Sequence, residues 1–401
     1  MTFRQDTSSI AREPANVTIL GVHVKSTGYP NVTFRIRDLE RSPQLQTREI
    51  NCPFGGSNVR QRNRSRIWRL LRSVWAAIRL TYAHLHVLVA YFWHGRPNRL
   101  YIPYPSTLVL FCLSLLPKVW RPGFVVADCF ISLYDTAVTD RGLISPDSWA
   151  AQALKTLESR AYRAADVIVV DTELNASYFT ETFGLAPSKV LALPLSIDES
   201  VFRLAPYLPS GDSCTVLFIG TFVPLQGADV IAQAAVILGA RRDIRFRLIG
   251  TGQTAEAVER IFSNRRPENV EWITQWMDGE RLAEAIRGTD ICLGIFSTGP
   301  KAQRVWPLKN YAYMATGRAI ITGDTLLTRQ MLLRADPVPF LTVPPGDPAA
   351  LASAIVALAQ DPERRKDYAK NARLFYDRNL CTRIAHEQLV SQLVRPIGNG
   401  L

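Results

Sequence analysis

Three basic side chains lie close together in the segment Asp290 to Asp324. Lys301, Arg304 and Lys309 fall within nine positions, after a short apolar run and around the start of a helical pattern. The start of a helix offers unpaired backbone N–H groups and a partial positive charge, so cations beside it make a site suited to a diphosphate. A solvated basic loop is the alternative interpretation, because short basic loops are common on protein surfaces.

Carboxylates in the first half of the chain are candidates for proton transfer. Asp128 and Asp135 lie at and just beyond the end of an expected strand, and Asp140 follows them. A carboxylate within hydrogen-bond distance of a bound hydroxyl group can accept its proton. The alternative is that each Asp caps a helix or forms a turn. His23, at the end of the opening strand, has a similar standing.

No cluster of residues predicts a bound metal. The sequence has no Asp-x-Asp pair, and His84 and His86 cannot share one helical face because a single residue separates them. The cysteines are widely scattered without a C-x-x-C pair, which indicates buried thiols in a reducing compartment. They are Cys52, Cys112, Cys129, Cys214, Cys292 and Cys381.

Strand-glycine-helix units in the second half would position the basic residues. Apolar runs at Thr215–Gly220 and Phe246–Ile249 each lead into a glycine loop and then a helical pattern, and Ile291–Phe296 leads into the basic loop. In open α/β sheets the carboxyl ends of such strands meet at one edge, where ligands bind. The loop residues expected at that edge are Gly220, Thr221, Phe222, Gly227, Gly250 and Gly252.

The first half alternates strands and helices in the same way, which predicts an α/β protein with doubly wound parallel sheets. Its expected strands are Val17–Val22, Leu100–Pro103, Phe124–Ala127, Val167–Val170 and Val190–Leu193. A polar, proline-rich stretch, Asp198–Ser213, breaks the rhythm, so we predict domains at residues 1–205 and 206–401. The last helical pattern, from about Thr382 to Val394, is a candidate for crossing back to the first domain.

The formal net charge of +12 indicates an anionic partner: nucleic acid, a phosphate-bearing substrate or anionic lipid. Seven arginines lie between Arg60 and Arg79, and within residues 60–94 apolar residues recur at helical spacing. This pattern is typical of a basic amphipathic helix on an anionic membrane. A core-packed helix with solvated arginines is the alternative, and RNA binding is a weaker one. We find neither a signal peptide nor 18 uninterrupted apolar residues.

Several of these segments resemble bacterial retaining glycosyltransferases of family 4. The resemblance lies in Gly220–Gly227, Leu248–Gln253, Ala165–Phe179 and Cys292–Asp324 and covers most of the chain from about Phe124. It implies a GT-B fold, in which two Rossmann-like domains face each other across a cleft. It also implies a nucleotide sugar as co-substrate, with no metal or other cofactor.

The resemblance assigns roles to individual residues. It implies donor binding in the C-terminal domain by the glycine loops with Lys301, Arg304, Lys309 and Tyr311. The N-terminal domain would bind the acceptor beside Gly28 and His23, with Asp128 or Asp135 as the proton acceptor. Four family charges are replaced: a loop lysine by Gln226, two glutamates by Arg304 and Ala312, and another expected acid by Gln330.

These features predict a cytoplasmic enzyme, peripheral on the inner face of the cell membrane. It would transfer a sugar to a lipid-linked saccharide in exopolysaccharide or lipopolysaccharide synthesis. The replaced glutamates leave a second hypothesis, a catalytically impaired GT-B protein that acts as the partner or scaffold of an active transferase. Weaker alternatives are a basic nucleic-acid-binding protein, although we expect no nucleic acid as partner, and a GT-B epimerase.

Overall fold

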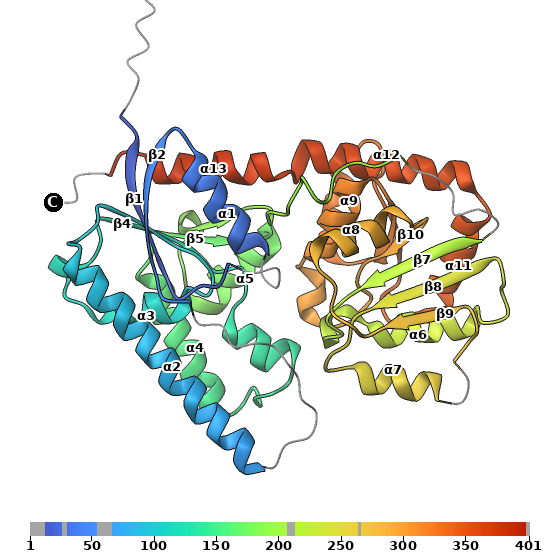
Figure 1. Cartoon of the computed structure of the whole chain (residues 1–401), viewed down its shortest axis with the longest axis horizontal. Coiled ribbons are helices and arrows are strands. Elements are labelled where there is room, and N and C mark those ends of the chain that lie inside the picture. The colour runs from blue at the N-terminus through green and yellow to red at the C-terminus, as the bar shows by residue number, and fades with distance from the viewer. Residues whose placement is uncertain (1–12, 26–29, 54–65, 207–212, 264–265, 398–401) are drawn as a thin grey trace, which may run out of the picture.

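Two parallel six-stranded sheets, one in each half of the chain, form the framework of the protein (Figure 1). The computed structural model describes residues 13–25, 30–53, 66–206, 213–263 and 266–397, without the side chains of residues 66–74 and 77. Helices flank both sheets. This arrangement confirms the predicted fold class.

The first sheet has the strand order β2-β1-β3-β4-β5-β6. Its strands are β1 (Ala15–Gly21), β2 (Leu45–Asn51), β3 (Arg99–Ile102), β4 (Phe124–Asp128), β5 (Val167–Val170) and β6 (Val190–Ala192). The helices between them are α1 (Pro30–Arg41), α2 (Arg66–Trp93), α3 (Thr107–Leu115), η1 (Lys118–Trp120), η2 (Asp135–Asp140), α4 (Trp149–Arg163), α5 (Glu173–Phe183) and η3 (Pro187–Lys189). Every residue of β4 and β5 is buried, as expected for central strands covered on both faces.

The second sheet has the strand order β12-β11-β10-β7-β8-β9. Its strands are β7 (Cys214–Ile219), β8 (Ile244–Ile249), β9 (Val270–Ile273), β10 (Ile291–Leu293), β11 (Ala319–Gly323) and β12 (Leu341–Val343). The helices are η4 (Pro224–Gln226), α6 (Ala228–Ile237), α7 (Ala255–Phe262), α8 (Gly279–Arg287), η5 (Pro300–Gln303), α9 (Leu308–Thr316), α10 (Leu326–Leu333), α11 (Pro348–Ala359), α12 (Pro362–Asn379) and α13 (Thr382–Val394).

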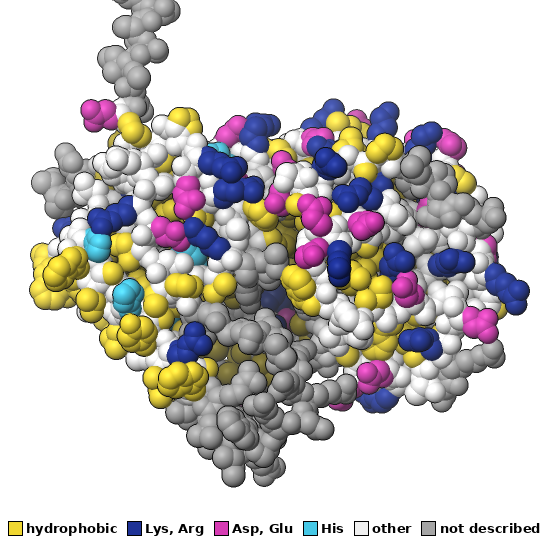
Figure 2. All heavy atoms as spheres, viewed as in Figure 1, with side chains coloured by type: hydrophobic (Ala, Val, Ile, Leu, Met, Phe, Trp, Pro, Cys, Tyr) yellow, Lys and Arg dark blue, Asp and Glu magenta, His cyan; other side chains and the backbone are white. Residues whose placement is uncertain are grey.

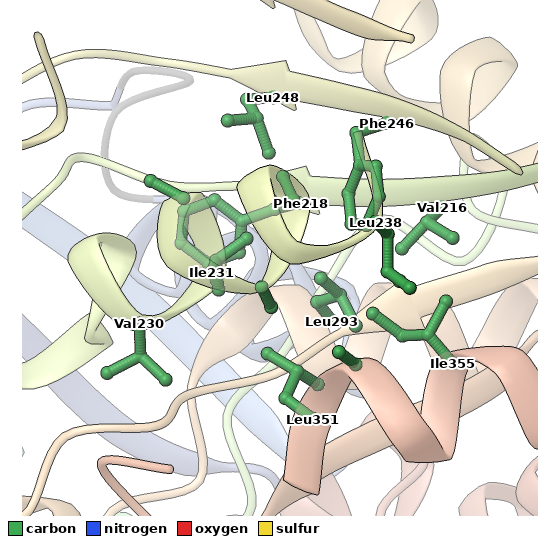
Figure 3. Close-up of a cluster of buried hydrophobic side chains, with 14 of the residues drawn as sticks. Val216, Phe218, Val230, Ile231, Leu238, Phe246, Leu248, Leu293, Leu351 and Ile355 are labelled. Carbon is green, nitrogen blue, oxygen red and sulfur yellow. The ribbon is translucent and has the colours of Figure 1, made fainter. Parts of the chain in front are cut away.

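A hydrophobic core fills the space between the second sheet and its helices (Figure 3). Phe218 of β7 and Leu293 of β10 point toward Ile231 of α6 and Leu351 of α11, and all four are fully buried. Burial of this kind supplies most of the driving force for folding. It also fixes the ends of β7 and β10, from which the loops of the candidate site emerge.

The last two helices cross from the second domain to the first along one side of the molecule (Figure 1). α12 packs against α9 and β11, whereas α13 packs against α1 and β1. The buried side chains of Leu389, Val390 and Leu393 in α13 belong to the same core cluster as Val17 of β1. Glu199 links the two helices. Its carboxylate accepts hydrogen bonds from the Tyr376 hydroxyl of α12 (2.7 Å) and from a backbone N–H of α13 (2.8 Å).

Helix α2 packs on the first domain through a narrow stripe of its surface. Ala83, Val87 and Tyr91 are buried, with at most 3% of their surface exposed. Residues 60–65 of the predicted basic segment lie outside the described part of the chain. So do the side chains of its arginines up to Arg72. Arg79 is described and is exposed.

Candidate functional site

Three loops meet at the carboxyl edge of the second sheet. The first loop follows β7, the second follows β8 and the third follows β10. A Cβ atom added to Gly250 would lie 1.8 Å from the carbonyl oxygen of Gly220, and one added to Gly252 would lie 1.8 Å from the carbonyl oxygen of Thr221. Glycine is therefore required where the loops after β7 and β8 touch. The third loop is joined to the first by a hydrogen bond from the N–H of Phe296 to the carbonyl of Gln226 (3.2 Å).

The predicted donor residues of the first loop divide into exposed and buried ones. Thr221 is exposed, whereas the ring of Phe222 is fully buried and stacks on Trp272 with centroids 5.6 Å apart. The Phe222 ring is part of the core, where a large apolar ring gains from burial, and donor binding at this loop position stays a prediction. Gly227 adopts a left-handed conformation (φ 63°) and caps the N-terminus of helix α6, which follows the loop directly.

Buried polar groups without hydrogen-bond partners gather around the ends of β7 and β10. They are Oε1 of Gln226, Nζ of Lys309, and both Oδ1 and Nδ2 of Asn310. Lys309 Nζ lies 3.8 Å from the centroid of the Phe218 ring. Buried polar groups in folded proteins are almost always paired, because an unpaired one costs free energy. This cluster therefore marks a place suited to a polar ligand.

Gly220 and Gly294, at the ends of β7 and β10, lie directly beside these polar groups. A Cβ atom on Gly220 would lie 2.3 Å from Gln226 Oε1 and 2.9 Å from the Phe218 ring, and a Cβ atom on Gly294 would lie 3.4 Å from Asn310 Nδ2. Burial lowers the pKa of Lys309 well below its usual value and so favours the neutral amine. An anion placed beside this amine would reverse that preference.

The other two predicted cations, Lys301 and Arg304, instead contact the first domain. Arg304 is 7% exposed, donates from Nη2 to Asp135, and lies over the ring of Tyr178 at 3.8 Å from its centroid. Lys301 Nζ lies 3.2 Å from Asp135 Oδ2. Asp135, predicted as a proton acceptor, thus bridges two cations across the domain interface.

Asp128, the other predicted proton acceptor, is completely buried in the first domain. Its Oδ2 accepts a hydrogen bond from Arg35 Nη1 (2.7 Å), and the Tyr101 hydroxyl lies 3.4 Å away. Burial raises the pKa of Asp128, and Arg35 opposes that rise. Asp128 is thus one partner of a buried ion pair, and its role as a proton acceptor stays a prediction.

On the predicted acceptor side, His23 is also fully buried. Its Nε2 lies 2.8 Å from Glu49 Oε1, and Lys25 donates to the other oxygen of Glu49 at 2.7 Å. Burial lowers the pKa of His23 despite Glu49, which favours the neutral ring. Lys25 and Glu49 also line a pocket of 430 Å³. Gly28 lies outside the described residues.

Helix α9 carries two residues singled out from the sequence. Tyr311 is 1% exposed and Ala312 is 5% exposed, and both belong to the hydrophobic cluster under the helix. The Tyr311 ring forms part of this core, and its donor contact stays a prediction. No carboxylate stands at Ala312.

Sequence reasoning missed Asn310 and the partners of Arg304. Asn310 had a local signal, because Lys309 and Asn310 are consecutive polar residues in the first turn of a largely apolar helix. Asn175 and Tyr178, which orient Arg304, had none, because they lie more than 120 positions away in the sequence.

Part of the chain matches a known protein family, and two known proteins are similar to it in sequence. Residues 213–361 match the family described as Glycosyl transferases group 1. A relative from Catenulispora acidiphila, D-inositol 3-phosphate glycosyltransferase 2, is 26% identical over 235 residues, which are 54% of this chain and 53% of that protein. A D-inositol 3-phosphate glycosyltransferase from Acidothermus cellulolyticus is 28% identical over 119 residues, 26% of each chain. The chain thus spans about half or less of these relatives' lengths.

Two solved structures share the architecture over nearly the whole chain. Sucrose-phosphate synthase from Thermosynechococcus elongatus superposes with a TM-score of 0.65 at 16% identity, covering 95% of this chain and 98% of that one. Anabaena HepE in complex with UDP gives a TM-score of 0.64 at 13% identity, covering 94% and 99%. The chain has the GT-B fold, and the match to the group 1 glycosyl transferases covers its residues 213–361.

Proposed function

We propose that the protein is a retaining glycosyltransferase of family 4, of the hexosyltransferase class, that uses a nucleotide-sugar donor. The unpaired polar cluster of Gln226, Lys309 and Asn310 carries this proposal. It lies at the carboxyl edge of a parallel sheet, within the residues that match the glycosyl transferase family. HepE, which shares the fold, was solved in complex with UDP, and this supports a nucleoside diphosphate as the ligand of such a site.

The chemistry assigned to this site is stabilisation of the leaving diphosphate. The N-terminus of α6 presents backbone N–H groups, and the Lys309 amine supplies a positive charge once it is protonated. Such groups are already positioned before the reaction, so they offset the developing charge without reorganisation. Transfer would then proceed to an acceptor bound by the first domain.

Titration calorimetry with UDP-, GDP- and dTDP-sugars tests the proposal directly. We expect one of the three to bind, and the absence of any binding would count heavily against a donor site. Ala312 favours a second candidate, a catalytically impaired partner or scaffold, because no carboxylate stands where one is expected to meet the ribose. A protein that binds a donor but neither hydrolyses nor transfers it, even as Ala312→Glu, would support that second candidate.

Donor binding should take up a proton at Lys309. Burial holds the pKa of the amine well below its usual value in the free protein, and a neighbouring phosphate would raise it. At a pH between those two values the complex binds one more proton than the free protein, so affinity should fall as pH rises. Calorimetry in two buffers of different ionisation enthalpy should give different heats for wild type and equal heats for Lys309→Met. Equal heats for wild type would contradict this prediction.

The acceptor in this proposal is a lipid-linked saccharide of surface polysaccharide synthesis, met at the inner face of the cell membrane. The exposed side of α2 supports it: large apolar side chains project there, over a helix that continues the arginine-rich segment (Figure 2). They are Trp75, Ile78, Tyr82, Leu85, Val89, Phe92 and Trp93. Within the described residues, no helix is long and apolar enough to cross a bilayer.

Removing two large rings from α2 should weaken binding to vesicles. Trp75 and Trp93 are 61% and 85% exposed, and each ring would gain apolar burial in the interfacial region of the bilayer. In flotation with vesicles containing anionic lipid, we expect Trp75→Ser/Trp93→Ser to lose most of the floated fraction. Trp276→Ser, which removes a 70% exposed ring from the second domain, is the matched control and should float as wild type does. Equal flotation of all three proteins would contradict the membrane role of α2.

A further inference from the structure

The short helix η2 of the first domain lies across the loops of the candidate donor site. Lys301 of the third loop contacts Asp135 (3.2 Å) and Asp140 (3.9 Å), and the backbone N–H of Leu225 in the first loop helps to offset the rise that burial causes in the pKa of Asp140. In the second loop, Gln253 donates to the carbonyl of Arg141, just after η2, at 3.3 Å. One segment of the first domain therefore touches all three loops.

The contacts pair carboxylates with the groups that a diphosphate would use. Asp135 meets Lys301 and Arg304, and Asp140 meets Lys301. Cations and backbone N–H groups are the usual partners of phosphate oxygens in proteins. Two carboxylates on one helical turn thus present two neighbouring negative charges to this set of donors.

The cationic side of this contact is rigidly built. Arg304 donates to the carbonyl of Pro300 (3.0 Å) and to Oδ1 of Asn175 (3.3 Å), while its guanidinium lies over the Tyr178 ring. Its orientation is therefore fixed independently of Asp135. η2 itself is a π-helical turn, a rare backbone form that is frequent at functional sites.

We propose that η2 is an internal competitor of the donor, with Asp135 and Asp140 occupying in the free protein the anion-binding groups that the donor diphosphate takes over. This inference rests on the proposed donor site. A nucleotide sugar would have to displace both carboxylates and loosen this part of the domain interface. The measured affinity is then the intrinsic affinity multiplied by the fraction of protein in which η2 is detached.

Neutralising both carboxylates should therefore strengthen anion binding. We expect Asp135→Asn/Asp140→Asn to bind UDP and inorganic pyrophosphate about tenfold more tightly than wild type, as for a typical coupling free energy. Asp147→Asn/Asp367→Asn changes the net charge equally at two exposed positions and should leave the affinity unchanged. Unchanged or weaker binding by the η2 variant, or equal strengthening in the control, would overturn the proposal.

Hydrogen exchange tests the contact between η2 and the third loop without any nucleotide. Hydrogen exchange of residues 299–304 and 135–141 in the ligand-free protein should be faster in Asp135→Asn/Asp140→Asn than in wild type, because the interface contact is lost. Unchanged exchange would overturn the internal competitor. If exchange is faster in the variant but neither protein binds a nucleotide, the η2 contact stands and the proposed function is rejected. Failure of the internal competitor and failure of the proposed function therefore give different results.

Discussion

Replacing Lys309 with methionine should weaken nucleotide-sugar binding by about tenfold to a hundredfold and leave the folded protein equally or more stable. Loss of one charged hydrogen bond to the ligand costs about 1.5–3 kcal/mol. The free protein, in contrast, loses a buried amine with no hydrogen-bond partner, and methionine fills a similar volume beside the Phe218 ring. Opposite effects on binding and stability would be specific to a ligand-binding lysine.

The two effects are measured by calorimetry with the donor and by the thermal midpoint of the free protein. Lys370→Met removes an exposed lysine from α12 and should change neither quantity. If Lys309→Met lowers the midpoint by several degrees, the amine stabilises the fold. If the variant binds donor as wild type does, the amine is not part of the site.

Replacing Arg35 with methionine should destabilise the first domain by about 3–5 kcal/mol, the cost of leaving one partner of a buried ion pair alone. The side chain of Arg35 is 2% exposed and that of Asp128 is 0% exposed, with 2.7 Å between Arg35 Nη1 and Asp128 Oδ2. Arg35 also donates to the carbonyl of Pro194 at 2.9 Å. Its loss would leave both the Asp128 carboxylate on β4 and the Pro194 carbonyl after β6 without this partner.

Urea unfolding monitored by circular dichroism measures this effect through the midpoint and slope. Arg37→Met, two positions along the same helix, removes a half-exposed arginine whose nearest carboxylates are 3.7–3.8 Å away, and should cost less than about 1 kcal/mol. Arg35→Met/Asp128→Asn should regain part of the loss because the remaining buried group is no longer charged. Equal effects of Arg35→Met and Arg37→Met would contradict the role assigned to the buried pair.

Much of the second domain could be predicted because local sequence determines it. Short apolar runs identify β7, β8 and β10, and Gly317 adopts the left-handed conformation that ends α9 (φ 69°). Strand β2 was missed because it lies at the edge of its sheet, where LQTREIN carries more polar than apolar residues. Its pairing with β1 depends on tertiary context and not on an alternating pattern.

The site was less predictable, because its contacts join residues far apart in the chain. Spacing located Lys301, Arg304 and Lys309 but could not show that the first two meet Asp135, which lies more than 160 positions earlier. The sequence also could not show that Asp128 pairs with Arg35, which lies 93 positions away. The direction of Lys309 depends on how α9 packs over β7, which no local pattern encodes.

Because α13 crosses back to the first domain, the core of that domain is completed late in synthesis. Leu389, Val390 and Leu393 complete the core of the first domain, and the Arg99 guanidinium on β3 donates to the carbonyl of Leu393 at 2.6 Å. A ribosome makes the strands of that domain before the second domain, and makes the helix that closes the first core after it. The second domain can therefore finish its own core while the first still exposes apolar surface, a period in which nascent chains are open to aggregation and to chaperones.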